Sequence, residues 1–205
     1  MEIFVVEFED WSTLLLRLNW FAIAIIFALV QIAIWLLKKH LSKKSIIVNE
    51  INLGIGDNSI TLTYNKKDQE IAYKLWIELS TRKIGLLFDK EHDVITEVYD
   101  SWYAFFKIAR ELLKDIPADR LQYSNDLIEL TEKVLNNGLR PHLTIWQAKY
   151  RKWYENALLT NTEDTPQELQ RKYPYYNELI DNLISTNKCM IEYKDLMKRI
   201  AFKDK

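Results

Sequence analysis

The feature that most constrains this chain is an uncharged apolar run near its N-terminus, residues 18–37, with the sequence LNWFAIAIIFALVQIAIWLL. At about 1.5 Å of rise per residue, a helix of this run is roughly 30 Å long, which matches the hydrocarbon core of a bilayer. A signal peptide is a poor alternative, because acidic residues precede the run and Trp-Leu-Leu-Lys-Lys ends it. A buried core helix is the other alternative, but a helix so uniformly apolar is unusual in a small domain. The run therefore predicts one transmembrane helix.

Charged residues on the two sides of the run predict its orientation. Lys38, Lys39, Lys43 and Lys44 follow it, whereas the residues before it are mostly acidic. Because positively charged flanks stay in the cytoplasm, we expect a short N-terminus outside and the remainder of the chain in the cytosol.

One face of the predicted span carries small and polar residues. Spacings of three and four place these residues on one side of a helix: Arg17, Phe21, Ala24, Ala28, Gln31 and Trp35. Small residues let membrane helices approach closely, and a polar residue in mid-span favours a partner or a water-filled cavity. This face is a candidate interface or pore lining between copies of the chain, although a span also tolerates one glutamine and several alanines. A single helix cannot conduct, so a pore requires several copies.

Beyond the span the pattern of apolar residues changes twice. Alternating apolar residues around Gly56-Asp57-Asn58 predict a β-hairpin, and from Asp68 onward the period is helical. The expected helices are 69–83, 93–115, 124–137, 141–159, a short one opened by a capping box at Thr165, and 175–202. We therefore expect a mainly α fold with one transmembrane helix, a short hairpin and a cytosolic bundle of five to six helices. The expected segments are an outer N-terminus at 1–13, the transmembrane helix at 14–40, the juxtamembrane hairpin at 41–66 and the helical bundle at 67–205.

Charge and cysteine content exclude several classes of function. The 28 Lys+Arg and 29 Asp+Glu give a net charge of -1, so an anion site must come from local clustering. The single cysteine, Cys189, excludes a disulfide framework within the chain and a multi-cysteine zinc site. The three histidines are far apart, and Glu91-His92-Asp93 is explained by the helix that begins there, where acids offset the helix dipole. We expect no catalytic residues, no metal and no cofactor.

The most informative stretch of the bundle is residues 138–158, GLRPHLTIWQAKYRKWYENAL. A helix start at Pro141 leaves backbone N–H groups that attract phosphates, and aromatic rings among cations bind single-stranded nucleic acid by base stacking. The candidate oligonucleotide-binding residues are Arg140, His142, Trp146, Lys149, Arg151 and Lys152, with Arg82 and Lys83 as a second basic group. The alternative is that Trp146, Tyr150 and Trp153 belong to the core and that the cations form an ordinary solvated face.

Three stretches of the bundle resemble small bacterial membrane proteins of anti-phage defence operons. They are IAYKLWIELSTRKIGL (71–86), HDVITEVYDSWYAFF (92–106) and GLRPHLTIWQAKYRKWYE (138–155). The chain looks most like the membrane effector of the Hailong system. That resemblance implies a homo-oligomeric channel, such as a tetramer, in the bacterial inner (plasma) membrane. It also implies gating by single-stranded DNA or another nucleotide signal from a neighbouring nucleotidyltransferase, with activation disrupting the membrane and arresting growth in an abortive infection.

A second resemblance is to the membrane accessory protein of type VI-B CRISPR loci, which implies a HEPN-like domain that acts with a cytosolic nuclease. The Arg–His spacing of HEPN ribonucleases is missing here. Three functions therefore remain open: an oligonucleotide-gated channel, a membrane-tethered scaffold that recruits a cytosolic partner, and a tethered nuclease that uses His142.

Overall fold

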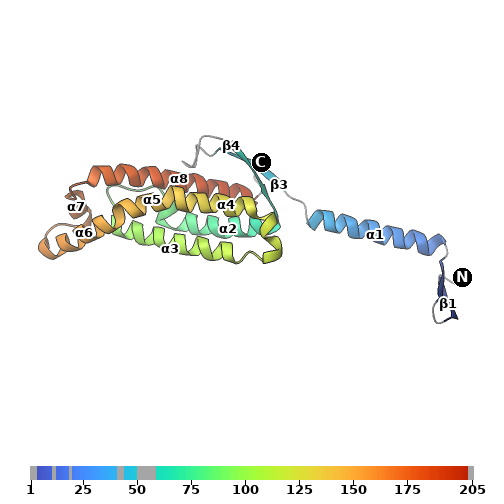
Figure 1. Ribbon diagram of the computed structural model, residues 1–205. Helices are drawn as coiled ribbons and strands as arrows, with labels where there is room; N and C mark the ends of the chain where they lie inside the picture. The colour runs from blue at the N-terminus through green and yellow to red at the C-terminus, as the bar shows by residue number, and fades with distance from the viewer. Residues whose placement is uncertain (1–3, 11–12, 19, 41–43, 50–58, 203–205) are drawn as a thin grey trace. The chain divides into compact units, whose positions relative to one another are not determined.

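The computed structural model describes residues 4–10, 13–18, 20–40, 44–49 and 59–202, and the side chains of residues 20–21, 23–37 and 62–202 (Figure 1). The chain divides into two units, Met1–Ser42 and Lys43–Lys205. It is mainly helical, as the sequence predicts, and the second unit is a helical bundle.

The first unit is a β-hairpin followed by one long helix. Strands β1 (Phe4–Asp10) and β2 (Thr13–Leu18) pair in antiparallel fashion, and helix α1 spans Trp20–His40. The helix predicted over 14–40 thus begins at Trp20, because the residues before it pair with a β-prone run that includes Val5. The prediction that Arg17 lies on the helical face is wrong, since Arg17 lies on β2 opposite Val5.

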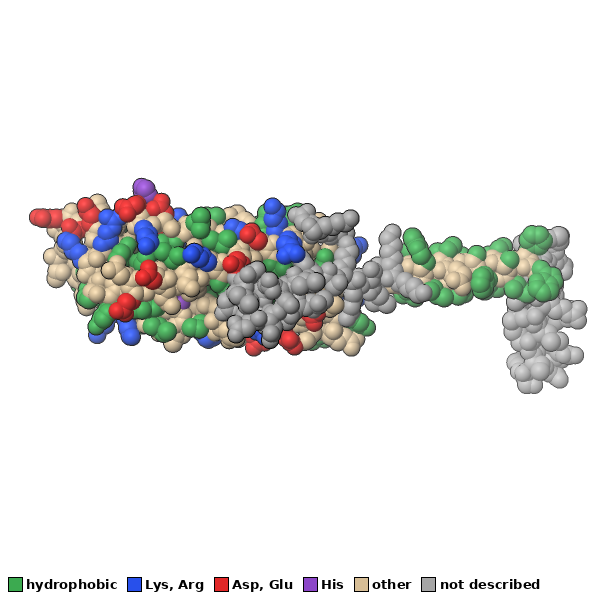
Figure 2. All heavy atoms as spheres, turned by 90° about the horizontal axis from the view of Figure 1, so that it is seen from above, with side chains coloured by type: hydrophobic (Ala, Val, Ile, Leu, Met, Phe, Trp, Pro, Cys, Tyr) green, Lys and Arg blue, Asp and Glu red, His purple; other side chains and the backbone are tan. Residues whose placement is uncertain are grey.

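Helix α1 has 21 residues, which at 1.5 Å each make about 31 Å. Every described side chain on it is exposed, and its large apolar side chains range from 40% exposed at Ile34 to 86% at Trp20 (Figure 2). The remaining members of the predicted face lie on this helix with the expected spacing: Phe21, Ala24, Ala28, Gln31 and Trp35. Among the described residues, no helix combines the length and the apolarity that crossing a membrane requires.

The second unit opens with the predicted hairpin. Strand β3 (Lys44–Asn49) pairs in antiparallel fashion with β4 (Ser59–Tyr64), and the predicted turn at 56–58 lies outside the described residues. Leu62 and Tyr64 alternate with Thr63 and are buried in the bundle. Asp126 Oδ2 accepts hydrogen bonds from the Thr63 N–H at 2.7 Å and from the Thr63 hydroxyl at 2.6 Å. These contacts fasten β4 to the helices.

The helical elements follow in chain order. They are α2 (Lys66–Thr81), η2 (Lys83–Gly85), α3 (Ile95–Lys114), η3 (Ala118–Tyr123), α4 (Asn125–Lys133), η4 (Val134–Leu139), α5 (Arg140–His142), η5 (Leu143–Gln147), α6 (Ala148–Thr160), α7 (Pro166–Arg171) and α8 (Tyr176–Phe202). The predicted capping box at Thr165 is confirmed: its side chain accepts from the Glu168 N–H, and Glu168 accepts from the Thr165 N–H. Asn65 and Asp68 form a second capping box at the start of α2.

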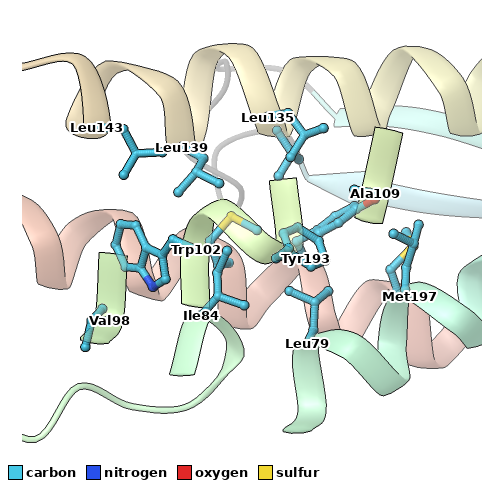
Figure 3. Close-up of a cluster of buried hydrophobic side chains, with 14 of the residues drawn as sticks. Leu79, Ile84, Val98, Trp102, Ala109, Leu135, Leu139, Leu143, Tyr193 and Met197 are labelled. Carbon is cyan, nitrogen blue, oxygen red and sulfur yellow. The ribbon is translucent and has the colours of Figure 1, made fainter. Parts of the chain in front are cut away.

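The core lies between α2, α3, the helical path 125–160 and α8 (Figures 1 and 3). Helices α2 and α8 pack against each other in antiparallel fashion. Two hydrogen bonds show this direction: Gln69, near the start of α2, donates to Ile200 O near the end of α8, and Lys194 of α8 donates to Gly85 O, which follows the end of α2. Buried apolar side chains from several helices pack together in this core, and Figure 3 labels ten of them: Leu79, Ile84, Val98, Trp102, Ala109, Leu135, Leu139, Leu143, Tyr193 and Met197.

The helix α3 begins differently from the prediction. Its N-cap residue, Val94, makes no side-chain hydrogen bond, and Asp93 instead accepts from the Asp89 N–H and pairs with Lys83. The Ile95 N–H, at the first position of α3, donates to Oε1 of Gln170 on α7 at 3.0 Å. The interpretation of 91–93 as helix-capping acids is therefore wrong, because a buried amide from a distant helix takes that role.

Candidate functional site at the π-helical segment

The predicted break between the helices at 124–137 and 141–159 does not exist. The helical path runs from Asn125 to Thr160 without interruption through η4 and η5, which are π-helical turns. Pro141 lacks a backbone donor and disrupts an ordinary α-helix, and it lies between these two wider turns. Residues 134–147, the π-helical segment, therefore form one continuous element, and such turns are frequent at functional sites.

This continuity removes the predicted phosphate site at a helix start. The Arg140 N–H bonds to Leu135 O, and the Leu143 N–H bonds to Arg140 O. The donors that a helix N-terminus would leave free are thus used within the helix. The prediction that Pro141 opens a helix and presents N–H groups to an anion is wrong.

His142 is buried, with 1% of its surface exposed. Its Nδ1 lies 2.6 Å from Asn182 Oδ1, which is an acceptor, so Nδ1 carries the proton and Nε2 accepts from the Tyr99 hydroxyl at 3.1 Å. Burial lowers the pKa of His142 to about 4, and the bond to Asn182 opposes this shift only in part. The imidazole is neutral at pH 7 and offers no charge to a phosphate.

The aromatic side chains of this region divide between the core and its margin. Tyr150 is fully buried, and its ring stacks on that of buried Tyr154 with the centroids 5.5 Å apart. Trp146 and Trp153 are partly buried and pack against the same core. The core interpretation is confirmed for Tyr150, and Trp146 keeps only part of its ring for a ligand.

The two arginines of the predicted set are held by α3. The Arg140 guanidinium lies 5.0 Å from the centre of the Phe106 ring, and its Nε donates to Asn136 Oδ1 at 3.0 Å. Arg151 Nη2 donates to Asp100 Oδ1 at 3.0 Å in a solvent-exposed pair. Asp100 compensates part of the Arg151 charge, which weakens that residue as an anion contact.

The two lysines of the set have a different environment. Lys149 and Lys152 are exposed on α6, and neither forms a hydrogen bond or an ion pair with a residue that the structure describes. They follow Ile145 by four and seven residues, so all three lie on the same side of the helical path. These lysines are the predicted cations that remain available to a phosphate.

The second basic group has structural partners of its own. Arg82 Nε bonds to Glu78 one turn earlier on α2, and Lys83 pairs with buried Asp93. Each cation is matched by an acid, so neither adds to an anion site as it stands. On the face of the bundle in Figure 2, Lys and Arg side chains are likewise mixed with acidic ones.

A pocket of about 200 Å³ lies between the π-helical segment and α8. The described residues that line it come from these two elements: Asn137, Gly138, Pro141, His142 and Ile145 from the first, and Asn182, Ser185, Thr186 and Cys189 from α8. A Cβ at Gly138 would lie 3.2 Å from Cys189 Sγ, so the glycine permits this close approach of the two helices. A shallower groove of about 420 Å³ lies beside Arg151 and Tyr103.

The α8 wall of this pocket was not among the predicted site residues. Ser185, Thr186 and Cys189 follow Asn182 by three, four and seven residues, so the four side chains lie on one side of α8. They form a stripe on a helix that supplies mostly apolar residues to the core. That stripe is the signal that could have located the site. Within the described part of the chain, no three His, Cys, Asp or Glu side chains are grouped so that they could hold a metal ion.

Together these elements define a helical-bundle protein with an N-terminal apolar helix and a polar pocket at a π-helical turn. No protein-family model matches the chain, and no curated protein and no solved structure matches it either.

Proposed function

We propose that the chain is a single-pass membrane protein of the bacterial inner membrane, anchored by α1, whose cytosolic helical bundle binds a single-stranded oligonucleotide. Copies assemble through α1 into a pore that the oligonucleotide controls, and the protein acts as a membrane effector of anti-phage defence. The observation that carries this proposal is α1 itself. It has no charged side chain from Trp20 to Leu37, and its large apolar side chains are exposed. Such an apolar surface is suited to contact with lipid or with other copies of the helix.

The membrane part of the proposal is tested by fractionation and topology. The full chain should remain in the membrane pellet after alkaline carbonate extraction. A reporter that is active only outside the cytoplasm should work at the N-terminus and fail at the C-terminus. Release by carbonate, or the opposite reporter pattern, would contradict the anchor.

The pore part is tested in planar bilayers with purified full-length protein. Conductance should appear and should change when single-stranded DNA is added on the side of the bundle. Gln31→Leu should alter it, because Gln31 lies on the face with Ala24 and Ala28, and the neighbouring change Val30→Leu is the matched control. An absence of conductance with and without DNA would exclude the channel.

The oligonucleotide part is supported by Lys149 and Lys152, which are exposed and lie on one side of the helical path. Lys149→Glu with Lys152→Glu should weaken binding of single-stranded DNA by roughly ten-fold or more, because each phosphate contact adds to the salt-dependent affinity. Lys198→Glu with Arg199→Glu, two exposed cations at the C-terminal end of α8, is the control of equal charge change. Affinity that is independent of salt, or equal losses in both variants, would contradict this binding surface.

A second candidate function is a membrane-tethered scaffold without a pore. It is favoured by isolated apolar side chains exposed on the bundle, of which Leu159 at 82% and Leu87 at 76% are the largest examples. A scaffold should be monomeric in detergent, and toxicity should require its cytosolic partner. The tethered-nuclease alternative is the least supported, because His142 is buried with both ring nitrogens bonded.

A further inference from the structure

The pocket between the π-helical segment and α8 is lined by the hydroxyl of a largely buried threonine. Thr186 is 8% exposed, lines the pocket, and forms no hydrogen bond with any residue that the structure describes. The hydroxyls of Thr131 and Thr81, also on helices, donate to the carbonyl four residues earlier. The Thr186 hydroxyl itself is not enclosed, so it opens into the pocket, where a ligand can accept a hydrogen bond from it or donate one to it.

The other polar groups of the pocket have unused capacity as well. Asn182 accepts from His142 through Oδ1, and its amide N–H groups have no partner among the described residues. Asn137 faces the same pocket with a full amide, and Ser185 adds a second hydroxyl. Donors and acceptors therefore converge from both walls, as in sites that fix the orientation of a small ligand.

Among the residues that the structure describes, no charged side chain lines this pocket. The His142 imidazole is neutral, and burial raises the pKa of the Cys189 thiol to about 11, so it stays protonated. A charged ligand would lose its hydration there without gaining a counter-charge. The volume of about 200 Å³ is below the range of roughly 300–1,000 Å³ for drug-sized ligands, which limits the occupant to a single small ring system.

A nucleobase fits these limits. It is uncharged and planar, proteins read its edge with amide and hydroxyl groups, and apolar side chains cover its faces. Ile145 and Pro141 supply apolar surface beside the polar groups. Lys149 lies one helical turn beyond Ile145 on the same side, about 6 Å along the axis, where it can meet the phosphate attached to a base held in the pocket.

We propose that this pocket holds one base of the bound oligonucleotide, with Thr186 and Asn182 contacting the base edge and Lys149 contacting the adjacent phosphate. This inference rests on the proposed oligonucleotide-binding function and adds to it a site that reads the base. It implies that binding depends on the base and not only on the sugar-phosphate backbone.

The test uses the full-length protein in detergent and two fluorescent DNA strands of equal length, one natural and one abasic. The natural strand should bind about five-fold more tightly than the abasic strand, as expected for one or two net hydrogen bonds. Thr186→Val, which replaces the hydroxyl with a methyl group, should reduce this difference, because the Asn182 contact to the base edge remains. Thr81→Val on the outside of α2 is the matched control. Equal affinities for both strands in the wild-type protein would overturn the proposal.

Ser185→Leu provides a second variant, since Ser185 is exposed and a larger side chain there should obstruct the pocket without disturbing the core. Free nucleosides, which lack a phosphate, separate the pocket from the wider function. Saturation-transfer NMR should detect a nucleoside on the wild-type protein and not on Ser185→Leu. Nucleoside binding without strand binding would refute the proposed function and support the base pocket. Strand binding without dependence on the base would support the proposed function and refute the base pocket. If neither the strand nor the nucleoside binds, both the proposed function and the base pocket are refuted.

Discussion

His142 on α5 and Asn182 on α8 are joined by a hydrogen bond of 2.6 Å from the imidazole Nδ1 to the amide Oδ1. The bond crosses between the π-helical segment and the longest helix of the bundle, and the Tyr99 hydroxyl bonds to the other ring nitrogen from α3. One neutral imidazole thus connects three helices at the floor of the polar pocket. Because a proton on Nε2 would break the bond that it accepts from Tyr99, this connection is sensitive to pH.

The stability of the bundle should fall in acid because of His142. Its pKa is about 4 in the folded protein and 6.5 for an unperturbed histidine, so the unfolded chain binds the proton more readily. The free energy of unfolding is not reduced by His142 above pH 6.5. It falls as the pH decreases from 6.5 towards 4, and the total loss is about 3 kcal/mol. Urea unfolding at pH 7 and pH 4 should therefore show a larger loss for the wild-type protein than for His142→Gln. Equal losses in the two proteins would show that His142 titrates normally.

The link between Asp126 and Thr63 should control how firmly β4 is attached to the bundle. Asp126→Ala removes the acceptor of two hydrogen bonds, at 2.7 and 2.6 Å, from the Thr63 backbone and hydroxyl. Hydrogen bonds to a charged group contribute roughly 1.5–3 kcal/mol each, so local opening of the hairpin should become much more frequent. Hydrogen–deuterium exchange at the Thr63 amide should accelerate. Asp119→Ala, on an exposed turn, is the control, and unchanged exchange in Asp126→Ala would refute the role.

Substitution of the two described glycines should have opposite outcomes. A Cβ at Gly85 would lie 2.0 Å from the backbone oxygen of Leu79, whereas at Gly138 its nearest contact is the Cys189 side chain at 3.2 Å. Gly85→Ala should lower the free energy of unfolding by about 2 kcal/mol or more, because backbone atoms must move. Gly138→Ala should change it by less than about 1 kcal/mol, since the gain in helix propensity offsets a small side-chain shift. Denaturant midpoints measure both, and a larger loss at Gly138 would contradict the geometry.

Asn187 should be a main stabiliser of the connection between α2 and α3. Its side chain accepts from the Phe88 N–H at 3.1 Å and donates to Ile84 O and Leu86 O at 3.0 Å each. Asn187→Ala leaves these backbone groups without partners and should cost about 2–4 kcal/mol of stability. Asn177→Ala, at an exposed site on the same helix, should change stability by less than about 0.5 kcal/mol. Similar unfolding midpoints for both variants would exclude the predicted role of Asn187.

The features that the sequence predicts correctly depend on local patterns. The helical period from Asp68 onward, the hairpin around residues 44–64 and the capping box at Thr165 each involve residues close together in the chain. The start of α3 could not be predicted this way, because its cap is Gln170, 75 residues later. The first helix is similar: its apolar run is evident from the sequence, but its start at Trp20 depends on the pairing of β2 with β1.

The candidate site shows the same division. The sequence by itself determines a basic and aromatic helical stretch at 138–158 and an uncharged run at 18–37, because composition and period are properties of the chain alone. Only the tertiary structure decides which of these side chains a ligand can reach. Packing against α3 and α8 buries His142 and Tyr150, pairs Arg151 with Asp100, and leaves Lys149 exposed. The physical reason is that burial and charge compensation depend on neighbouring helices that are distant in sequence.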